Sequence, residues 1–159
     1  MHDAEHAAKH DANHDAKRRA AQVAQLVDYF ERLQAADLSR LDQFYSAPAW
    51  FKDPFNEVTG LAAVRAVYEH MFNTLDEPRF VITDVLHQGD SAVLVWRFHF
   101  RMRRFDRNVQ CIRGCSHLSF DAQHRILRHR DYWDVAEELY EKLPMLGALM
   151  RWLKRRAAG

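Results

Sequence analysis

The stretch AVLVWRFHFRMR, residues 92–103, alternates apolar and polar side chains along its length. Large apolar residues occupy the even positions from Leu94 to Met102, namely Leu94, Trp96, Phe98, Phe100 and Met102. Successive side chains of a β-strand point to opposite faces of the sheet, so this alternation predicts a strand with one apolar face. Burial stabilises each apolar side chain by about 1.5–3 kcal/mol, whereas a buried, unpaired arginine is costly. We therefore expect the apolar face to line the interior, with Arg97, His99 and Arg101 on the outer face.

Three further segments show the same alternation on either side of this stretch. They are FVITDVLH (80–87), VQCIRGCSHLSF (109–120) and ILRHRDYW (126–133), and the turn-like sequences QGDS, RFDRN and DAQH separate the four segments. This arrangement predicts four antiparallel strands in the second half of the chain.

The first half of the chain has the periodicity of helices. Apolar residues recur at helical spacing over 20–36 and 61–75, a shorter helix is expected over 38–45, and a brief extended segment is expected at 50–53. Another helix is expected from about 135 to 142. Helices that precede an antiparallel sheet predict an α+β fold.

The composition predicts one domain with a substantial core, because 48% of the 159 residues are apolar. With 23 basic and 22 acidic residues, no overall field draws the chain to nucleic acid. Cys111 and Cys115 are expected to be reduced structural thiols. The sequence has no long apolar run, glycine-rich phosphate loop or core metal-ligand cluster, so we expect a cytoplasmic protein without a cofactor.

The two ends of the chain differ from the middle. Residues 1–19 form a His- and Asp-rich segment with few apolar residues, expected to be a disordered or weakly helical tail, followed by a domain over 20–143. The repeat of His2, His6, His10 and His14 could bind a metal on a helix, but low complexity explains it better, and no metal site is predicted. Residues 144–159 pair Leu146, Leu149, Met150 and Leu153 with basic residues. This segment predicts weak contact with a membrane surface or a helix across a pocket mouth.

The element order, together with YFERLQAAD (29–37) and FKDPF (51–55), resembles the nuclear transport factor two-like superfamily. That superfamily includes ketosteroid isomerases, SnoaL-like cyclases and limonene epoxide hydrolase, and the resemblance covers about 22–143. It implies a cone-shaped α+β fold in which N-terminal helices pack on a curled, mostly antiparallel sheet that encloses a pocket.

The resemblance also implies the site residues. Tyr29 and Asp53 match the hydrogen-bonding tyrosine and general base of the isomerases, and Ser116 stands where those enzymes have a protonated Asp. HRDYWD (129–134) is similar to the last strand of limonene epoxide hydrolase and SnoaL-like proteins, which implies that Asp131 acts as an acid or base. His129, two residues before it, is a candidate to relay protons with Asp131. Substrate contacts are expected from Phe51, Trp96, Phe98, Ser116 and Trp133. Arg97 and His99 are an alternative, inexact match to the hydrolase Arg-x-Asp pair.

Structural interpretations stand beside these roles. Asp53 before Pro54 is also typical of a turn, Asp131 and His129 also suit a pair that holds the sheet together, and Tyr29 also suits the core.

The function implied by the resemblance is acid/base chemistry on a steroid-, terpenoid-, polyketide- or lipid-like substrate, as an isomerase, cyclase, hydrolase or hydratase. The alternative is a non-catalytic, dimeric ligand-binding or accessory protein of the same superfamily. A homodimer is predicted in either case, because the outer sheet face carries Val93, Val95 and Val109 beside Arg97 and His99.

Overall fold

The computed structural model describes residues 2–103, 108–138 and 144–157, with side chains placed at 17–103, 108–138, 150 and 152–157. Its helical elements are α1 (His2–Arg32), the 3-10 helix η1 (Ala35–Gln43), α2 (Leu61–Thr74), α3 (Val135–Glu138) and α4 (Pro144–Ala157). Its strands are β1 (Tyr45–Lys52), β2 (Glu57–Thr59), β3 (Leu75–Gln88), β4 (Ser91–Met102), β5 (Gln110–Phe120) and β6 (Ile126–Tyr132). The α+β class predicted from the sequence is confirmed.

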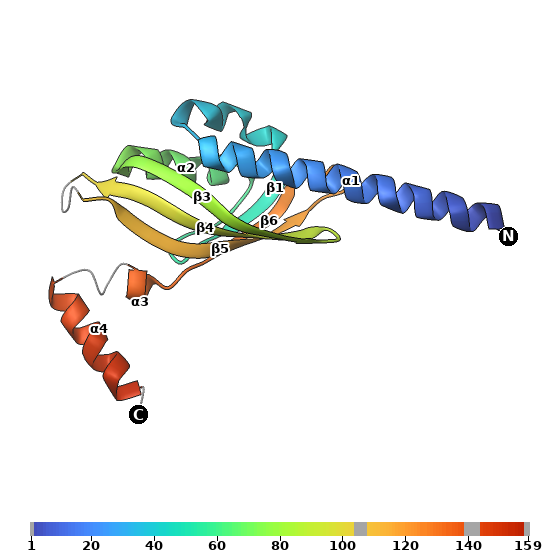
Figure 1. The fold of residues 1–159 in the computed structure, drawn as a ribbon. Helices are drawn as coiled ribbons and strands as arrows, with labels where there is room; N and C mark the ends of the chain where they lie inside the picture. Colours follow the sequence, from blue (N-terminus) through green and yellow to red (C-terminus); the bar gives the residue numbers. More distant parts are fainter. Residues whose placement is uncertain (1, 104–107, 139–143, 158–159) are drawn as a thin grey trace.

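The strands form one six-stranded sheet in the order β2-β1-β6-β5-β4-β3. All neighbouring strands are antiparallel except β1 and β6, which run parallel. The four predicted strands are β3 to β6, and β1 and β2 extend the sheet beyond β6. Figure 1 shows the sheet curving beneath α1 and α2, which cover one of its faces.

The helical layer begins with a single long helix. α1 runs through both the His-rich segment and the predicted helix over 20–36, and Figure 1 shows its N-terminal part projecting beyond the sheet. The helix ends at Arg32, and the Asp37 carboxylate then accepts a hydrogen bond from the Gln34 backbone N–H at 3.0 Å. This capping interaction starts η1, so the chain turns earlier than expected.

Two elements between α1 and α2 differ from the prediction. The expected helix over 38–45 is the 3-10 helix η1, in which Leu38 and Leu41 are buried three residues apart, the period of a 3-10 turn. The extended segment expected at 50–53 is the longer strand β1, which includes the exposed Pro48. The register between β1 and β6 is irregular between Tyr45 and Trp50, and an irregularity of this kind accommodates a residue that lacks an N–H donor.

The side chains of β4 are buried on one face of the strand and more exposed on the other, as predicted. Leu94, Trp96, Phe98 and Phe100 are buried, whereas Arg97 is exposed on the opposite face. The register between β4 and β5 is continuous from Ser91↔Ser119 to Phe100↔Gln110, so no bulge between these strands reverses the alternation. The core joins this face to residues of α1, η1, β1 and α2, among them Leu26, Leu41, Tyr45 and Val64.

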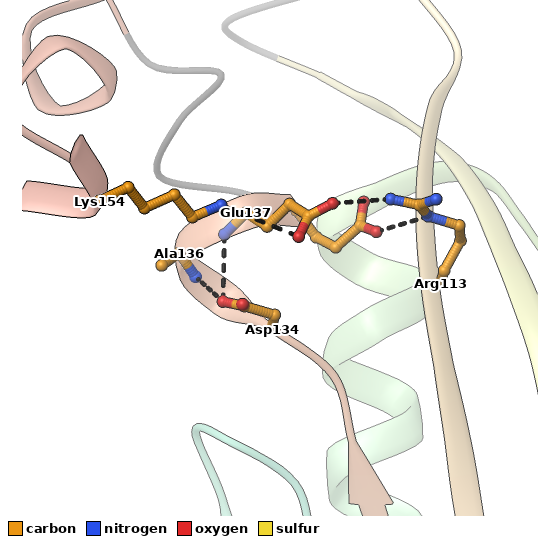
Figure 2. A network of polar contacts seen from close by, with 6 residues as sticks. Arg113, Asp134, Ala136, Glu137 and Lys154 are labelled. Carbon is orange, nitrogen blue, oxygen red and sulfur yellow. Dashed lines mark hydrogen bonds and ion pairs between the residues drawn. The ribbon is translucent and has the colours of Figure 1, made fainter. Parts of the chain in front are cut away.

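The C-terminal elements lie apart from this core. Asp134 caps α3 by accepting hydrogen bonds from the backbone N–H groups of Ala136 and Glu137 at 2.9 and 3.1 Å. Figure 2 shows Arg113 of β5 pairing with Glu137, which Lys154 of α4 also approaches. The remainder of the helix expected to about 142 falls outside the described residues. No helix in the described ranges is long and apolar enough to cross a membrane.

Candidate functional site

A cavity of about 370 Å³ lies between the inner face of the sheet and the helices. Residues of α1, β1, the loop after β1, α2 and strands β3 to β6 line it, including Phe30, Phe51, Asp53, Tyr68, Met71, Phe80, Trp96, Phe98, Phe100, Ile112, Ser116, His129, Asp131 and Trp133. Its volume lies toward the lower end of the range for small-molecule sites, and most of its lining is apolar. The cavity therefore suits a small apolar ligand.

Aromatic side chains form one wall of the cavity. The rings of Phe80 and Phe98 stack with their centroids 4.5 Å apart, Phe98 stacks on Phe100 at 5.2 Å, and Trp96 meets the Phe80 ring edge to face at 5.6 Å. These rings come from paired residues of β3 and β4, because Phe80 pairs with Phe98 and Ile82 with Trp96. The strand register thus builds a continuous aromatic surface.

Asp131 of β6 places a carboxylate within this apolar lining. The Ser116 hydroxyl donates to Asp131 Oδ1 at 2.5 Å, and His129 Nε2 lies 2.8 Å from the same oxygen. Asp131 pairs with Ser116 in the register of β5 and β6, and it shares a face of β6 with His129. The Asp131 side chain is only 16% exposed. Two donors therefore fix one carboxylate oxygen, and no hydrogen bond from the described residues reaches the other oxygen, Oδ2.

His129 links Asp131 to two buried tyrosines. His129 Nδ1 lies 2.5 Å from the Tyr45 hydroxyl, and that hydroxyl lies 2.9 Å from the hydroxyl of Tyr68. His129 is 3% exposed and Tyr45 is fully buried. The His129 ring stacks with Tyr45 and meets Phe51 edge to face, with centroids 4.9 Å apart for the second pair. Both hydrogen bonding and packing therefore hold the imidazole in place.

The donors in this network follow from the chemistry of the groups. The Trp96 indole N–H can only donate, and it donates to Ser116 Oγ at 2.9 Å, so Ser116 accepts there and donates onward to Asp131. With an ionised Asp131, His129 Nε2 must also donate, because a carboxylate only accepts. A neutral His129 then accepts from Tyr45 at Nδ1, and Tyr45 accepts from Tyr68. Two chains of hydrogen bonds therefore end at Asp131, one from Trp96 through Ser116 and the other from the two tyrosines through His129.

The tyrosines in this network keep their protons. Burial raises the pKa of Tyr45 well above its usual value, and the neighbouring Tyr68 adds to the effect. Burial likewise raises the pKa of Tyr68, with the charge of Asp131 as a further cause. Each hydroxyl therefore remains a neutral donor and acceptor between Asp131 and the helical layer.

Asp53 lines the same cavity but has partners within its own loop. Its Oδ1 accepts from the backbone N–H groups of Phe55 and Asn56 at 2.7 and 2.5 Å, and the Asn56 side-chain amide donates to Oδ2 at 2.9 Å. This geometry is that of an Asp-Pro turn. Phe55 is exposed and meets the ring of Trp133 at 5.5 Å, so this turn places an aromatic pair at the cavity wall.

The other predicted residues occupy three different places. Phe51, Trp96, Phe98, Ser116, His129 and Trp133 line the cavity together with Asp131 and Asp53. Tyr29 is buried outside the cavity lining, where its hydroxyl donates to the Asp37 carbonyl at 2.9 Å and burial raises its pKa to about 12. Arg97 and His99 lie on the outer face of β4, as their alternation predicted, and His99 Nε2 lies 4.0 Å from Cys111 Sγ.

Tyr45 and Tyr68 are the members of the network that sequence reasoning missed. Tyr45 ended a predicted helix, and Tyr68 was one residue of an apolar helix face. A tyrosine on such a face requires a partner for its hydroxyl, which was the available signal. Its partner could not be named, because β1 and α2 meet β6 only in the folded chain.

The residues with described side chains form no group of three His, Cys, Asp or Glu positioned to hold a metal ion. The side chains of His2, His6, His10 and His14 lie outside the described part of the structure.

Comparison with solved structures shows which known folds this chain is similar to. Solved structures similar to this chain include TsrD from Streptomyces laurentii, with a TM-score of 0.65 and 20% identity over 80% of this chain and 96% of that one. A candidate SnoaL-like polyketide cyclase from Jannaschia sp. CCS1 has a TM-score of 0.65 and 13% identity, over 76% of this chain and 88% of that one. A Catenulispora acidiphila protein with a ketosteroid isomerase-like fold, in complex with trimethylamine, has a TM-score of 0.63 and 12% identity, over 74% of this chain and 88% of that one. At these identities the likeness shows the fold alone.

The sequence itself matches a family model. No curated protein matches the chain. The model of the SnoaL-like domain matches residues 26–129, which run from the buried face of α1 to the histidine of the Asp131 network. The chain therefore belongs to the SnoaL-like domain family, within the nuclear transport factor two-like superfamily that its sequence resembled.

Proposed function

We propose that this protein is an enzyme that uses Asp131 as a general base on an apolar small molecule bound in the cavity. The observation that carries the proposal is the arrangement around Asp131. Two donors converge on Oδ1, whereas Oδ2 receives no hydrogen bond from the described residues. A carboxylate held in this way at the wall of an apolar cavity is oriented to accept a proton from a bound molecule.

The proposed step is a single proton transfer. Asp131 Oδ2 takes a proton from a carbon or from a water molecule next to the substrate, and the electron pair of the broken bond stays on the substrate or on the water oxygen. Ser116 and His129 keep their hydrogen bonds to Oδ1 and hold the carboxylate in place. A later step returns the proton from Asp131, so the residue acts first as a base and then as an acid.

The lining indicates the kind of substrate. The stacked Phe80, Phe98 and Phe100 offer an apolar surface, and Ser116, His129 and Asp131 form a polar cluster within it. A steroid-, terpenoid-, polyketide- or lipid-like molecule with one polar end fits this division. The name of the Jannaschia relative, a candidate polyketide cyclase, agrees with this class. Isomerisation, cyclisation, dehydration and hydration all use the proposed step.

Asp53 and Tyr29 have smaller parts in this proposal than the resemblance implied. The Asp53 carboxylate already accepts hydrogen bonds from Phe55 and Asn56, and Tyr29 donates to Asp37 outside the cavity lining. We assign Asp53 to shaping the loop at the cavity and Tyr29 to fixing the junction of α1 and η1. The outward direction of Arg97 and His99 favours a role away from the cavity.

A binding protein without catalysis is the second candidate. The observation that favours it is the engagement of Asp53, which leaves only Asp131 of the two carboxylates that the isomerase and hydrolase resemblances together implied. Such a protein would retain an apolar ligand unchanged.

One experiment separates the two candidates. The purified protein and its Asp131→Asn variant are each incubated with a lipid and metabolite extract, and bound and converted species are compared by mass spectrometry. Conversion by the native chain and not by the variant would support the enzyme. A ligand retained unchanged by both proteins would contradict catalysis and support the binding protein. An Asp53→Asn variant, which keeps one oxygen for the turn hydrogen bonds, serves as the matched control.

A further inference from the structure

The C-terminal helix α4 has exposed apolar and basic side chains next to one another. Trp152 and Leu153 are 46% and 44% exposed, and the next three residues, Lys154, Arg155 and Arg156, are exposed as well. Figure 1 shows α4 separated from α1 and α2 by the sheet. The helix thus presents large apolar side chains away from the core that the rest of the domain forms.

The sequence of the helix extends this pattern along its length. Residues 146, 149, 150 and 153, all Leu or Met, recur at the i, i+3, i+4, i+7 spacing of one helix face. From Pro144 to Ala157 the sequence contains four basic residues and no acidic one. An apolar stripe flanked by cations alone is the composition of a helix that lies in the interface of an anionic membrane.

The position of Arg156 supports this interpretation. Its guanidinium lies over the Trp152 ring at 5.2 Å from the centroid. A tryptophan beside an arginine suits the boundary between acyl chains and headgroups, where the ring is half-buried and the cation meets phosphate. Basic residues in the last turn also stabilise the helix by offsetting its dipole, but that effect does not explain the exposed Trp152 and Leu153.

The described contact between α4 and the domain leaves Trp152, Leu153, Arg155 and Arg156 exposed. Lys154 Nζ lies 3.9 Å from a Glu137 oxygen, and Glu137 pairs with Arg113, so α4 is joined to the outer side of β5 through α3 (Figure 2). We propose that α4 is an interfacial helix that docks the domain on anionic lipid surfaces through Trp152, Leu153, Arg155 and Arg156. This function is independent of the chemistry proposed for Asp131.

The test is flotation of the full chain with phosphatidylcholine vesicles, either pure or with about a third of the lipid as phosphatidylserine. We expect flotation with the anionic vesicles only. An Arg155→Gln/Arg156→Gln variant leaves the Lys154 contact in place, and each lost cation should lower partitioning about fivefold, so its binding should fall by at least about tenfold. Trp152→Ala should also weaken binding. Added salt should weaken binding of the native chain, because it screens the attraction between the basic side chains and the anionic lipid.

The control is Lys17→Gln/Arg18→Gln, which removes the same charge from exposed residues of α1 and should float like the native chain. The proposal would be overturned if the native chain fails to float with anionic vesicles, or if the Arg155→Gln/Arg156→Gln variant floats equally well. Self-association of the native chain that Trp152→Ala abolishes, without any flotation, would instead identify a second copy as the occupant of this face.

Discussion

At the scale of single residues, the site depends on His129, which connects Asp131 to the buried tyrosines. Its two ring nitrogens have different partners, Tyr45 at Nδ1 and Asp131 at Nε2. The Tyr45 hydroxyl is therefore a positioning group, because it acts on the Asp131 carboxylate only through the His129 imidazole.

The first prediction concerns Tyr45→Phe. Loss of the hydroxyl leaves His129 Nδ1 without its buried donor, while the hydrogen bond between Nε2 and Asp131 still fixes the tautomer. The ring is then held at one nitrogen only, and the ¹⁵N resonance of Nδ1 should shift. Unfolding in urea should show a loss of about 1–3 kcal/mol, the usual cost of an unsatisfied buried polar group. Tyr132→Phe, which removes an exposed hydroxyl from the outer face of β6, is the matched control. Unchanged His129 resonances in Tyr45→Phe would show that the hydroxyl does not orient the ring.

The second prediction follows from the raised pKa values of Tyr45 and Tyr68. An unfolded tyrosine loses its proton near pH 10, whereas these buried hydroxyls keep theirs to higher pH. The folded state thus binds more protons above about pH 10, and the free energy of unfolding should fall as pH rises from there. Urea unfolding between pH 8 and about 11 should show a steeper decline for the native chain than for Tyr45→Phe/Tyr68→Phe. Parallel slopes would contradict the burial of neutral phenols.

At the scale of elements, the close packing of β4, β5 and β6 fixes the indole of Trp96. Gly114 pairs with Trp96 across β4 and β5, and a Cβ at Gly114 would lie 2.5 Å from Trp96 Cη2 and 2.8 Å from the Tyr132 carbonyl oxygen. Because Gly114 has no side chain, the Trp96 ring can occupy this space, from which its indole N–H donates to Ser116.

The third prediction is therefore that Gly114→Ala destabilises the protein by about 1–3 kcal/mol, the usual cost of overpacking a core. The variant should also displace the Trp96 indole and weaken its hydrogen bond to Ser116, which a change in the indole N–H resonance would report. Gly89→Ala is a poor comparison, because Gly89 has a positive φ of 56°. Ala92→Gly removes a buried methyl group from the same sheet face, and it gives the combined cost of a small cavity and of a more flexible backbone. A Gly114→Ala variant as stable as the native chain would refute this packing.

The elements also show what the sequence could predict. Alternation in 92–103 placed Trp96 and Phe98 inside and Arg97 outside, because strand parity is a local property. The turn around Asp53 could also be predicted from the sequence, because an Asp-Pro turn is made by hydrogen bonds to residues only two or three positions later in the chain. The meeting of Tyr45, Tyr68 and His129 was not, because it depends on a parallel pairing of β1 with β6 and on the position of α2. Such contacts join residues far apart in the chain and have no local pattern.

At the scale of the whole molecule, the outer face of the sheet opposes the cavity. Val93 and Val95 are partly exposed there, and Arg97 lies beside them. Arg113 on the same face pairs with Glu137 and Glu138, so α3 covers the part over β5. The area left for a partner lies over β3 and β4.

The fourth prediction is that the chain forms a homodimer through this area. A stable interface buries about 800 Å² per partner, and the apolar side chains on this face supply its centre. Sedimentation equilibrium at micromolar concentration should give a dimer, and Val95→Arg should give a folded monomer. Leu127→Arg, a change at an exposed residue of β6, should remain dimeric. A monomeric native chain would contradict the prediction.

The proposed chemistry depends on Asp131 as the base within the cavity. Once the extract comparison has identified a converted compound, the most direct measurement is kcat/KM for that compound with native protein, Asp131→Asn and Asp53→Asn. Loss of a general base costs about 10²–10⁴ in rate, so Asp131→Asn should fall by that factor while Asp53→Asn stays within about tenfold of native. An Asp131→Asn variant with native kcat/KM, or a larger loss in Asp53→Asn, would contradict the assignment of Asp131 as the base.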